Sequence, residues 1–325
     1  MVRRIDVIGA GGVHLAAWEF TRSPEGGQEP GGECAQGPGE GSGESAEPDS
    51  APGVLLLHGL MGRASHWAPA ARLLAEGHRV VALDQRGHGD SGKPAEGPFT
   101  REAHLADAVA VIERLDLAPV TLVGHAAGAL TAWQLAAARP DLVRALIVCD
   151  MRAAAHGAAS QREWADWFRS WPLPFASLAE ARRWFGEADP WLERPSPARG
   201  EFFAEMMAEG AEGWRPVFSR EQLLAARAAW AHDAHWDQLA QVTCPALVVR
   251  GPDGQLGRAE AQEMVRVLPR GRYAEVAEGG HLVHYERPAA WYAAIEPFLD
   301  AHCRDRDHDR DRAPEGDGVR ASGPG

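Results

Sequence analysis

Residues 120–128 read VTLVGHAAG, and this stretch decides the fold that the sequence predicts. Its first four residues are apolar or β-branched, which is typical of a strand buried on both faces of a parallel sheet. Residues 127–138 have helical composition, so a strand, a sharp turn and a helix follow one another here. Gly124 and Gly128 flank the turn, because only small residues let the backbone turn so sharply and pack against neighbouring strands. Ala126 lies at the centre of this turn.

Strands and helices alternate on both sides of the turn. Such alternation predicts an α/β fold with a mostly parallel sheet and helices on both of its faces. Residues 2–8 and 13–20 should add a hairpin at the start. The other expected strands are 54–57, 79–83, 145–149, 246–250 and 272–276, and the other expected helices are 67–76, 101–115, 258–268 and 288–301.

Two segments have too few apolar residues to form a core. The first is rich in Gly, Pro, Glu and Ser, and the second is a run of Asp and Arg followed by Gly and Pro, so both should be disordered. One hairpin is too little to fold alone, so we interpret the first segment as an insertion within one domain. The predicted organisation is therefore an N-terminal hairpin at 1–22, a disordered insertion at 23–52, the core at 53–150 and 242–302, a helical cap at 151–241, and a disordered tail at 303–325.

Composition excludes several classes of function. The 325 residues carry a formal net charge of −13, and such an acidic surface repels nucleic-acid phosphates and anionic lipid, so we expect neither as a partner. The four cysteines contain no C-x-x-C pair, which argues against a disulfide framework and a zinc site. No apolar run spans a bilayer, and the N-terminus lacks an apolar signal region. We expect a soluble cytoplasmic protein without a metal or another cofactor.

Three further motifs follow the strands in order. HGLMG at 58–62 comes directly after the apolar strand 54–57, DQRGHGDS at 84–91 follows the next strand, and GGHLVHYERP at 279–288 follows the last one. Together with GHAAG at 124–128, they resemble the α/β-hydrolase superfamily, whose elbow motif is G-x-S-x-G. The resemblance covers nearly all of the chain outside the insertion, the cap and the tail. It implies an α/β-hydrolase sheet with an inserted helical cap.

The resemblance also implies a role for individual residues. Ala126 stands where the family carries its nucleophilic serine, and His281 stands where it carries the catalytic histidine. The backbone N–H groups of Leu60 and Ala127 correspond to the oxyanion hole. His58 should pin the loop that carries Leu60.

Other polar residues near these motifs are expected to support the structure. His125 should point into the molecule, and His284, about one helical turn after the catalytic histidine, should be a packing or surface residue. Asp84 and Arg86 are expected to stabilise the loop that follows the strand 79–83.

The acid that would orient His281 has two candidates. The family usually supplies it after the seventh strand, where the sequence reads GPDG and Asp253 comes one position early. A subset of the family takes it from the end of the sixth strand, where Asp150 stands. We favour Asp253 and keep Asp150 as the alternative acid; capping a loop is the competing role for each.

The alanine at position 126 leads to three hypotheses about function. A methyl group has no lone pair and no proton, so this nucleophile position is inactive and cannot form an acyl-enzyme. The first hypothesis is nucleophile-free hydrolysis or lyase-type chemistry with His281 as the base. The second is a ligand-binding pseudoenzyme, and the third is an ordinary serine esterase whose nucleophile was mutated. Turnover itself stays open.

The predicted cap indicates the kind of ligand. Eight of the twelve tryptophans lie between residues 151 and 241, and an inserted cap over the sheet edge is where this fold places its pocket. Most of these rings should pack the cap helices together, and some should line the pocket. We therefore expect a small apolar or aromatic molecule as the partner, and leave the substrate and the oligomeric state open.

Overall fold

The sheet that positions the site has eight strands and is mostly parallel. The computed structural model describes residues 1–22, 51–94 and 99–303. The strand order is β1-β2-β4-β3-β5-β6-β9-β10; the pairs β1–β2 and β2–β4 are antiparallel, and all later pairs are parallel. The strands are β1 (Val2–Ile8), β2 (His14–Phe20), β3 (Gly53–Leu57), β4 (Arg79–Asp84), β5 (Val120–His125), β6 (Val143–Cys149), β9 (Ala246–Arg250) and β10 (Gly271–Glu275).

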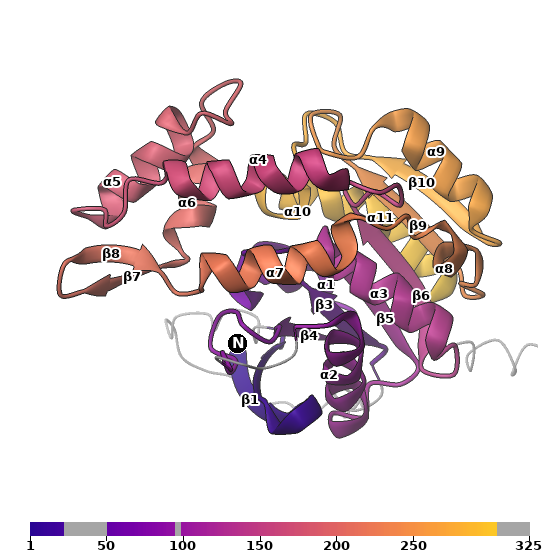
Figure 1. Cartoon of the computed structure of the whole chain (residues 1–325). Coiled ribbons are helices and arrows are strands. Elements are labelled where there is room, and N and C mark those ends of the chain that lie inside the picture. Colours follow the sequence, from indigo (N-terminus) through magenta and orange to yellow (C-terminus); the bar gives the residue numbers. More distant parts are fainter. Residues whose placement is uncertain (23–50, 95–98, 304–325) are drawn as a thin grey trace, which may run out of the picture.

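Helices cover both faces of this sheet, as the alternation predicts (Figure 1). Along β3, Leu55 and Leu57 point into one core, whereas Val54 and Leu56 point into the other, since successive side chains of a strand alternate between faces. The helices α2, α3, α8 and α9 supply the first core, and α1, α10 and α11 supply the second. Their bounds are α1 (Ala68–Leu74), α2 (Arg101–Arg114), α3 (Ala127–Ala138), α8 (Trp236–Ala240), α9 (Arg258–Val267), α10 (Val283–Glu286) and α11 (Pro288–His302).

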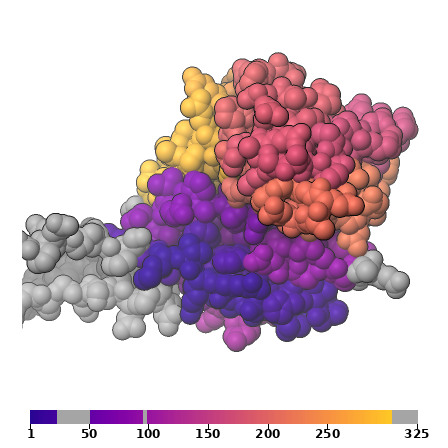
Figure 2. Space-filling view, turned by 90° about the vertical axis from the view of Figure 1, so that its left-hand side faces the viewer, coloured from indigo at the N-terminus to yellow at the C-terminus, as the bar shows by residue number. Residues whose placement is uncertain are grey.

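Residues 157–231 lie outside the sheet and form a layer beside the carboxyl ends of its strands (Figure 1), whereas α8, which the predicted cap at 151–241 includes, packs against α3 and α9. Figure 2 shows residues 157–231 stacked on the part of the molecule that the first 150 residues build. Most of their buried aromatic side chains form a third core, whereas Trp230 packs in the first. The sequence predicts only helices here, and the two-stranded sheet β7–β8 is an addition that it did not predict. The elements are α4 (Gly157–Ser170), α5 (Leu178–Arg183), a π-helical turn (Trp184–Ala188), α6 (Pro197–Ala204), β7 (Met207–Gly210), β8 (Gly213–Pro216) and α7 (Arg220–Ala231).

The two segments expected to be disordered fall almost wholly outside the described residues. Of the insertion at 23–52, only residues 51 and 52 are described, and of the tail at 303–325 only Cys303 is. Cys303 is fully buried, and its Sγ lies 3.0 Å from the Thr121 hydroxyl, so the packed core extends one residue past the expected boundary. No helix within the described part of the chain is long and apolar enough to cross a membrane.

Candidate active site

The turn between β5 and α3 has a strained backbone. Ala126 has φ 48° and ψ −122°, a region that costs a residue with a side chain about 1–3 kcal/mol. Its N–H donates to the Cys149 carbonyl at 3.0 Å, and its own carbonyl accepts from Ala129 N–H at 2.8 Å, which holds the conformation. A Cβ on Gly128 would collide with the carbonyl oxygens of Leu57 and His58 at the end of β3, and one on Gly124 would collide with the Ala129 backbone. The predicted need for glycine at both places is confirmed.

His281 lies on the loop between β10 and α10, and its ring is hydrogen-bonded to a buried carboxylate. Its Nδ1 lies 2.7 Å from Asp150 Oδ2. Asp150 directly follows β6, is only 1% exposed, and also accepts the N–H groups of Gln255 at 2.7 Å and Leu256 at 3.2 Å. Three donors therefore hold the carboxylate in one orientation, and the carboxylate in turn fixes the imidazole. Nε2 is then the ring nitrogen left for the pocket, which His281 lines.

The prediction that His281 forms a hydrogen bond with Asp253 is wrong. Asp253 is exposed and forms an ion pair with Arg194, while its backbone N–H donates to the Gly279 carbonyl at 3.1 Å. The loop after β9 wraps around Asp150 instead, so closely that a Cβ on Gly254 would collide with that carboxylate. The loop thus encloses the acid that β6 supplies, and the alternative candidate occupies the position beside His281.

His125, His284 and His58 are buried, and burial lowers the pKa of each. His125 Nε2 lies 2.8 Å from the His281 carbonyl oxygen, and burial, followed by His284 and His281, holds the pKa of His125 well below its usual range. Burial likewise lowers the pKa of His284 to about 3, and its ring packs 3.9 Å from Trp67. His58 Nδ1 lies 2.8 Å from the Gly59 carbonyl oxygen, and Nε2 accepts the Gln85 N–H at 3.0 Å. These contacts match the supporting positions expected for all three.

The loop after β3 and the start of α3 both reach the pocket. Leu60 and Ala127 line the same pocket as Ala126 and His281. Ala127 is the first residue of α3, so its N–H has no acceptor within the helix.

The DQRGHGDS segment holds the loops around this region in place. Asp84 accepts the N–H of Ala64 at 2.6 Å and of Asp90 at 3.0 Å. Arg86 pairs at 2.6 Å with Asp107 of α2, and both side chains are buried. The contacts agree with the structural roles expected for Asp84 and Arg86.

Above Ala126 lies a largely aromatic pocket of about 710 Å³, counted with its open mouth. Some tryptophans of residues 151–241 line it, as expected, while Trp171, for example, packs in the third core instead. Within the described ranges, no group of three or more metal-ligating side chains is present. The lining aromatic residues are Trp164, Trp167, Trp191, Phe202, Phe203 and Trp230.

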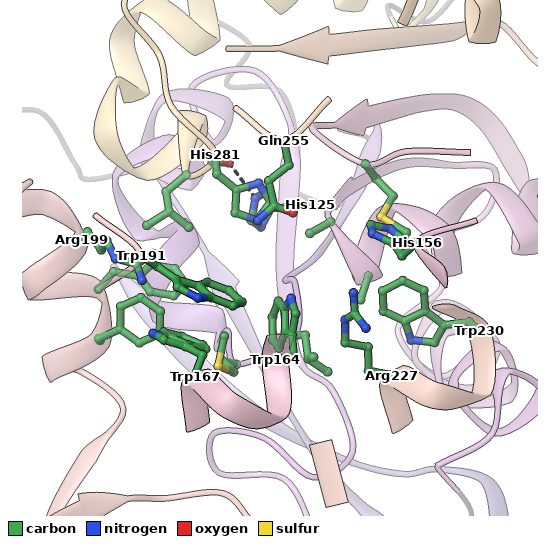
Figure 3. Close-up of a pocket in the computed structure, with 18 residues that line it drawn as sticks. His125, His156, Trp164, Trp167, Trp191, Arg199, Arg227, Trp230, Gln255 and His281 are labelled. Atoms are coloured by element: carbon green, nitrogen blue, oxygen red, sulfur yellow. Dashed lines mark hydrogen bonds between the residues drawn. The ribbon is translucent and has the colours of Figure 1, made fainter. Parts of the chain in front are cut away.

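Four polar side chains of this pocket were missed by the sequence analysis: His156, Arg199, Arg227 and Gln255 (Figure 3). A signal for Arg227 was present. It falls on the buried stripe of α7, at the i+4 position after Leu223 and three residues before Trp230. A charged residue on an apolar helix face is a departure that calls for a partner.

Comparison with known proteins agrees with this architecture. A hydrolase of (E)-2-((N-methylformamido)methylene)succinate from Acinetobacter baylyi is 27% identical over 258 residues, covering 76% of this chain and 90% of that protein. A putative esterase/lipase from Haemophilus influenzae is 26% identical over 249 residues, covering 76% and 83%. The crystal structure of an E-2-(acetamidomethylene)succinate hydrolase superposes with a TM-score of 0.73 at 22% identity, covering 92% of this chain and all of that one.

The family described as "Alpha/beta hydrolase family" matches residues 54–295. This range contains the turn at Ala126, the HGLMG loop, Asp150 and His281, and it covers most of the chain. The chain therefore belongs to the alpha/beta hydrolase family.

Proposed function

We propose that this protein binds a small apolar or aromatic molecule above Ala126 and acts on it with His281 as a general base, without a covalent intermediate. The observation that carries the proposal is the 2.7 Å hydrogen bond between His281 Nδ1 and Asp150. A binding pocket has no need of a buried carboxylate that three donors hold against an imidazole, whereas a base does.

The chemistry follows from the positions of these groups. His281 Nε2 takes a proton from water, which attacks an ester or amide carbonyl, or from an acidic C–H of the bound molecule. Asp150 stabilises the imidazolium that forms. The N–H groups of Leu60 and Ala127 would act as the oxyanion hole for the developing charge. The first route is nucleophile-free hydrolysis and the second is lyase-type chemistry; in both, residues 151–241 act as the cap that covers the reacting groups.

Ala126 favours a second candidate, a ligand-binding protein without turnover. Its methyl group removes the nucleophile on which covalent members of the family depend. A third candidate, a serine esterase with a mutated nucleophile, shares the pocket and the His281–Asp150 pair. The candidates differ in whether the chain with Ala126 has a reaction that needs His281.

Proton exchange tests the base without knowledge of the substrate. Small aryl esters, thioesters and ketones with an acidic α-proton are incubated with the protein in deuterated water, and α-deuteration is followed by nuclear magnetic resonance. We expect exchange about 10²–10⁴ times faster with the unmodified protein than with His281→Gln for the compounds that bind. Asp253→Asn is the matched control and should exchange normally. Equal rates with His281→Gln across compounds that bind would favour the non-catalytic candidate.

A further inference from the structure

Arg227 is a buried cation that faces the pocket. It lies on α7, its residue is only 1% exposed, and it lines the same cavity as Ala126 and His281. Its guanidinium lies between two indole rings, 4.9 Å from the centroid of Trp164 and 5.7 Å from that of Trp230. This stacking fixes the plane of the guanidinium in advance of any ligand.

Arg227 forms no ion pair among residues 1–22, 51–94 and 99–303, and the one charge that favours its protonated form, Glu163, acts from beyond ion-pair distance. Its Nη1 donates to Gln161 Oε1 and its Nη2 to Ser160 Oγ, each at 2.6 Å, and both acceptors are neutral. The other arginine of the pocket, Arg199, has Asp189 as its partner. A guanidinium has five N–H donors, so three of those on Arg227 are left without an acceptor in the part of the chain that the structure describes. Burial lowers the pKa of Arg227 to about 10, which leaves it charged at neutral pH.

A neutral polar group lies at the same end of the cavity. His156 lines the pocket, its ring is 5.5 Å from that of Trp230, and its buried Nε2 has no hydrogen-bond partner among the described residues. Burial, followed by the nearby Arg227, lowers the pKa of His156 to about 4, so the ring is uncharged at neutral pH. This end of the cavity therefore presents one positive charge and one unused hydrogen-bonding nitrogen.

We propose that Arg227 and His156 form a subsite for a carboxylate, so that the bound molecule is an apolar or aromatic carboxylic acid. A carboxylate neutralises the single charge and accepts parallel N–H bonds from the planar guanidinium. A phosphate dianion would leave one negative charge uncompensated in a buried place, which is costly. The inference refines the ligand of the proposed function and rests on the same pocket.

The arrangement orients the ligand across the reacting groups. Figure 3 shows His156, Arg227 and Trp230 together at one side of the pocket, Trp167 and Trp191 at the other, and His281 between the two sides. A carboxylate on Arg227 thus leaves the apolar body of the acid to pass His281 toward the tryptophans. The bond to be broken, or the acidic proton, would lie in the middle of the molecule.

The experiment must distinguish a carboxylate-binding role of Arg227 from a purely structural role. Because Ser160 and Gln161 lie on α4, the arginine also connects α4 to α7. Gln161→Ala removes part of that connection and keeps the charge, so it serves as the matched control. Arg227→Lys keeps a charge without the planar fork, and Arg227→Met keeps length without charge.

Calorimetry and tryptophan fluorescence measure the binding of matched pairs, such as phenylacetate with phenylacetamide and indole-3-acetate with its amide. We expect the unmodified protein to prefer each carboxylate by about 10- to 100-fold, the range for a hydrogen-bonded charge. Arg227→Met should abolish the preference, Arg227→Lys should reduce it, and Gln161→Ala should keep it. Thermal unfolding and circular dichroism check that each variant is folded.

Binding of amides as tightly as carboxylates, failure to bind any carboxylate of the panel, or a preference that survives Arg227→Met would overturn the proposal. His281→Gln separates this result from the proposed function. If it binds carboxylates with the normal preference while proton exchange never depends on His281, the subsite stands and the catalytic proposal fails. If exchange depends on His281 but amides bind equally well, the catalytic proposal stands and the subsite fails.

Discussion

Ala126→Ser should convert the site into a serine esterase. The backbone at residue 126 already has the positive φ of 48° that the turn requires, so alanine and serine share the same strain. The substitution adds one oxygen to a side chain that faces the pocket. We therefore expect the free energy of unfolding to change by less than about 1 kcal/mol.

The gain in rate can be bounded from the groups that surround residue 126. Removing the nucleophile from a serine triad costs about 10⁶ in kcat, while the oxyanion hole and binding keep about 10³–10⁴ over water. His281, which is hydrogen-bonded to Asp150, lines the same pocket as Ala126, and so do Leu60 and Ala127, the proposed oxyanion donors. Restoring it should accelerate hydrolysis of p-nitrophenyl esters by about 10³-fold or more over the unmodified chain.

The assay combines ester hydrolysis with labelling by a serine-directed phosphonate, read by mass spectrometry. The unmodified chain should stay unlabelled, and Ala126→Ser should be labelled at residue 126 alone. The double variant with His281→Gln controls for non-specific reaction and should hydrolyse poorly. A folded Ala126→Ser variant that neither hydrolyses the ester nor takes the label would refute the assignment of the site, as would labelling of another serine in the unmodified chain.

Three smaller tests address the acid, the histidines and the core. In the Ala126→Ser background, Asp150→Asn should lower ester hydrolysis by about 10³–10⁴, because the imidazole loses its orienting charge, whereas Asp253→Asn should have little effect; equal losses would contradict the geometry. The pKa of His284 is lowered to about 3 against an unfolded value of about 6.5, so the unfolded chain binds the extra proton and stability falls as the pH drops through this window. His284→Phe should lower the slope of the free energy of unfolding against pH by about 1.4 kcal/mol per pH unit, which corresponds to one proton, as measured by denaturant unfolding. An unchanged slope would show that His284 is not the source of this pH dependence. Asp107→Ala removes the carboxylate that neutralises the buried Arg86, and should lower the free energy of unfolding by about 3–5 kcal/mol; a loss below 1 kcal/mol would show that the pair is dispensable.

The fold could be predicted because its signals are local. Continuous apolar runs such as 54–57 mark strands buried on both faces, and paired glycines mark the turn at Ala126, where any Cβ would meet backbone. The sheet order and the helices on both faces confirm the expected architecture. The β7–β8 hairpin was missed, because Trp214 in β8 is held by a bridge to Phe175, a residue distant in the sequence. Composition near 214 gives no sign of that pairing.

The acid was assigned wrongly for a related reason. Asp253 and Asp150 both follow strands whose ends meet at one edge of the sheet, so either could reach His281 in principle. What decides between them is the path of the loop after β9, in which Asp253 N–H donates to the Gly279 carbonyl and Gln255 N–H donates to Asp150. These bonds form only once β9 and β10 are adjacent, so the sequence spacing alone cannot supply them.

Three features of one pocket each lower the stability of the fold. Ala126 is strained where glycine would relieve the backbone, Asp150 is a buried carboxylate, and Arg227 is a buried cation whose contacts within the described part of the chain are all neutral. The cost at Asp150 is offset by three donors, one of which is His281. At Arg227 the described residues provide neutral acceptors, two indole faces and the more distant charge of Glu163 but no ion pair, and a bound carboxylate would provide one. Since strained and uncompensated groups concentrate at functional sites, their convergence above Ala126 favours a pocket that binds its ligand beside a base.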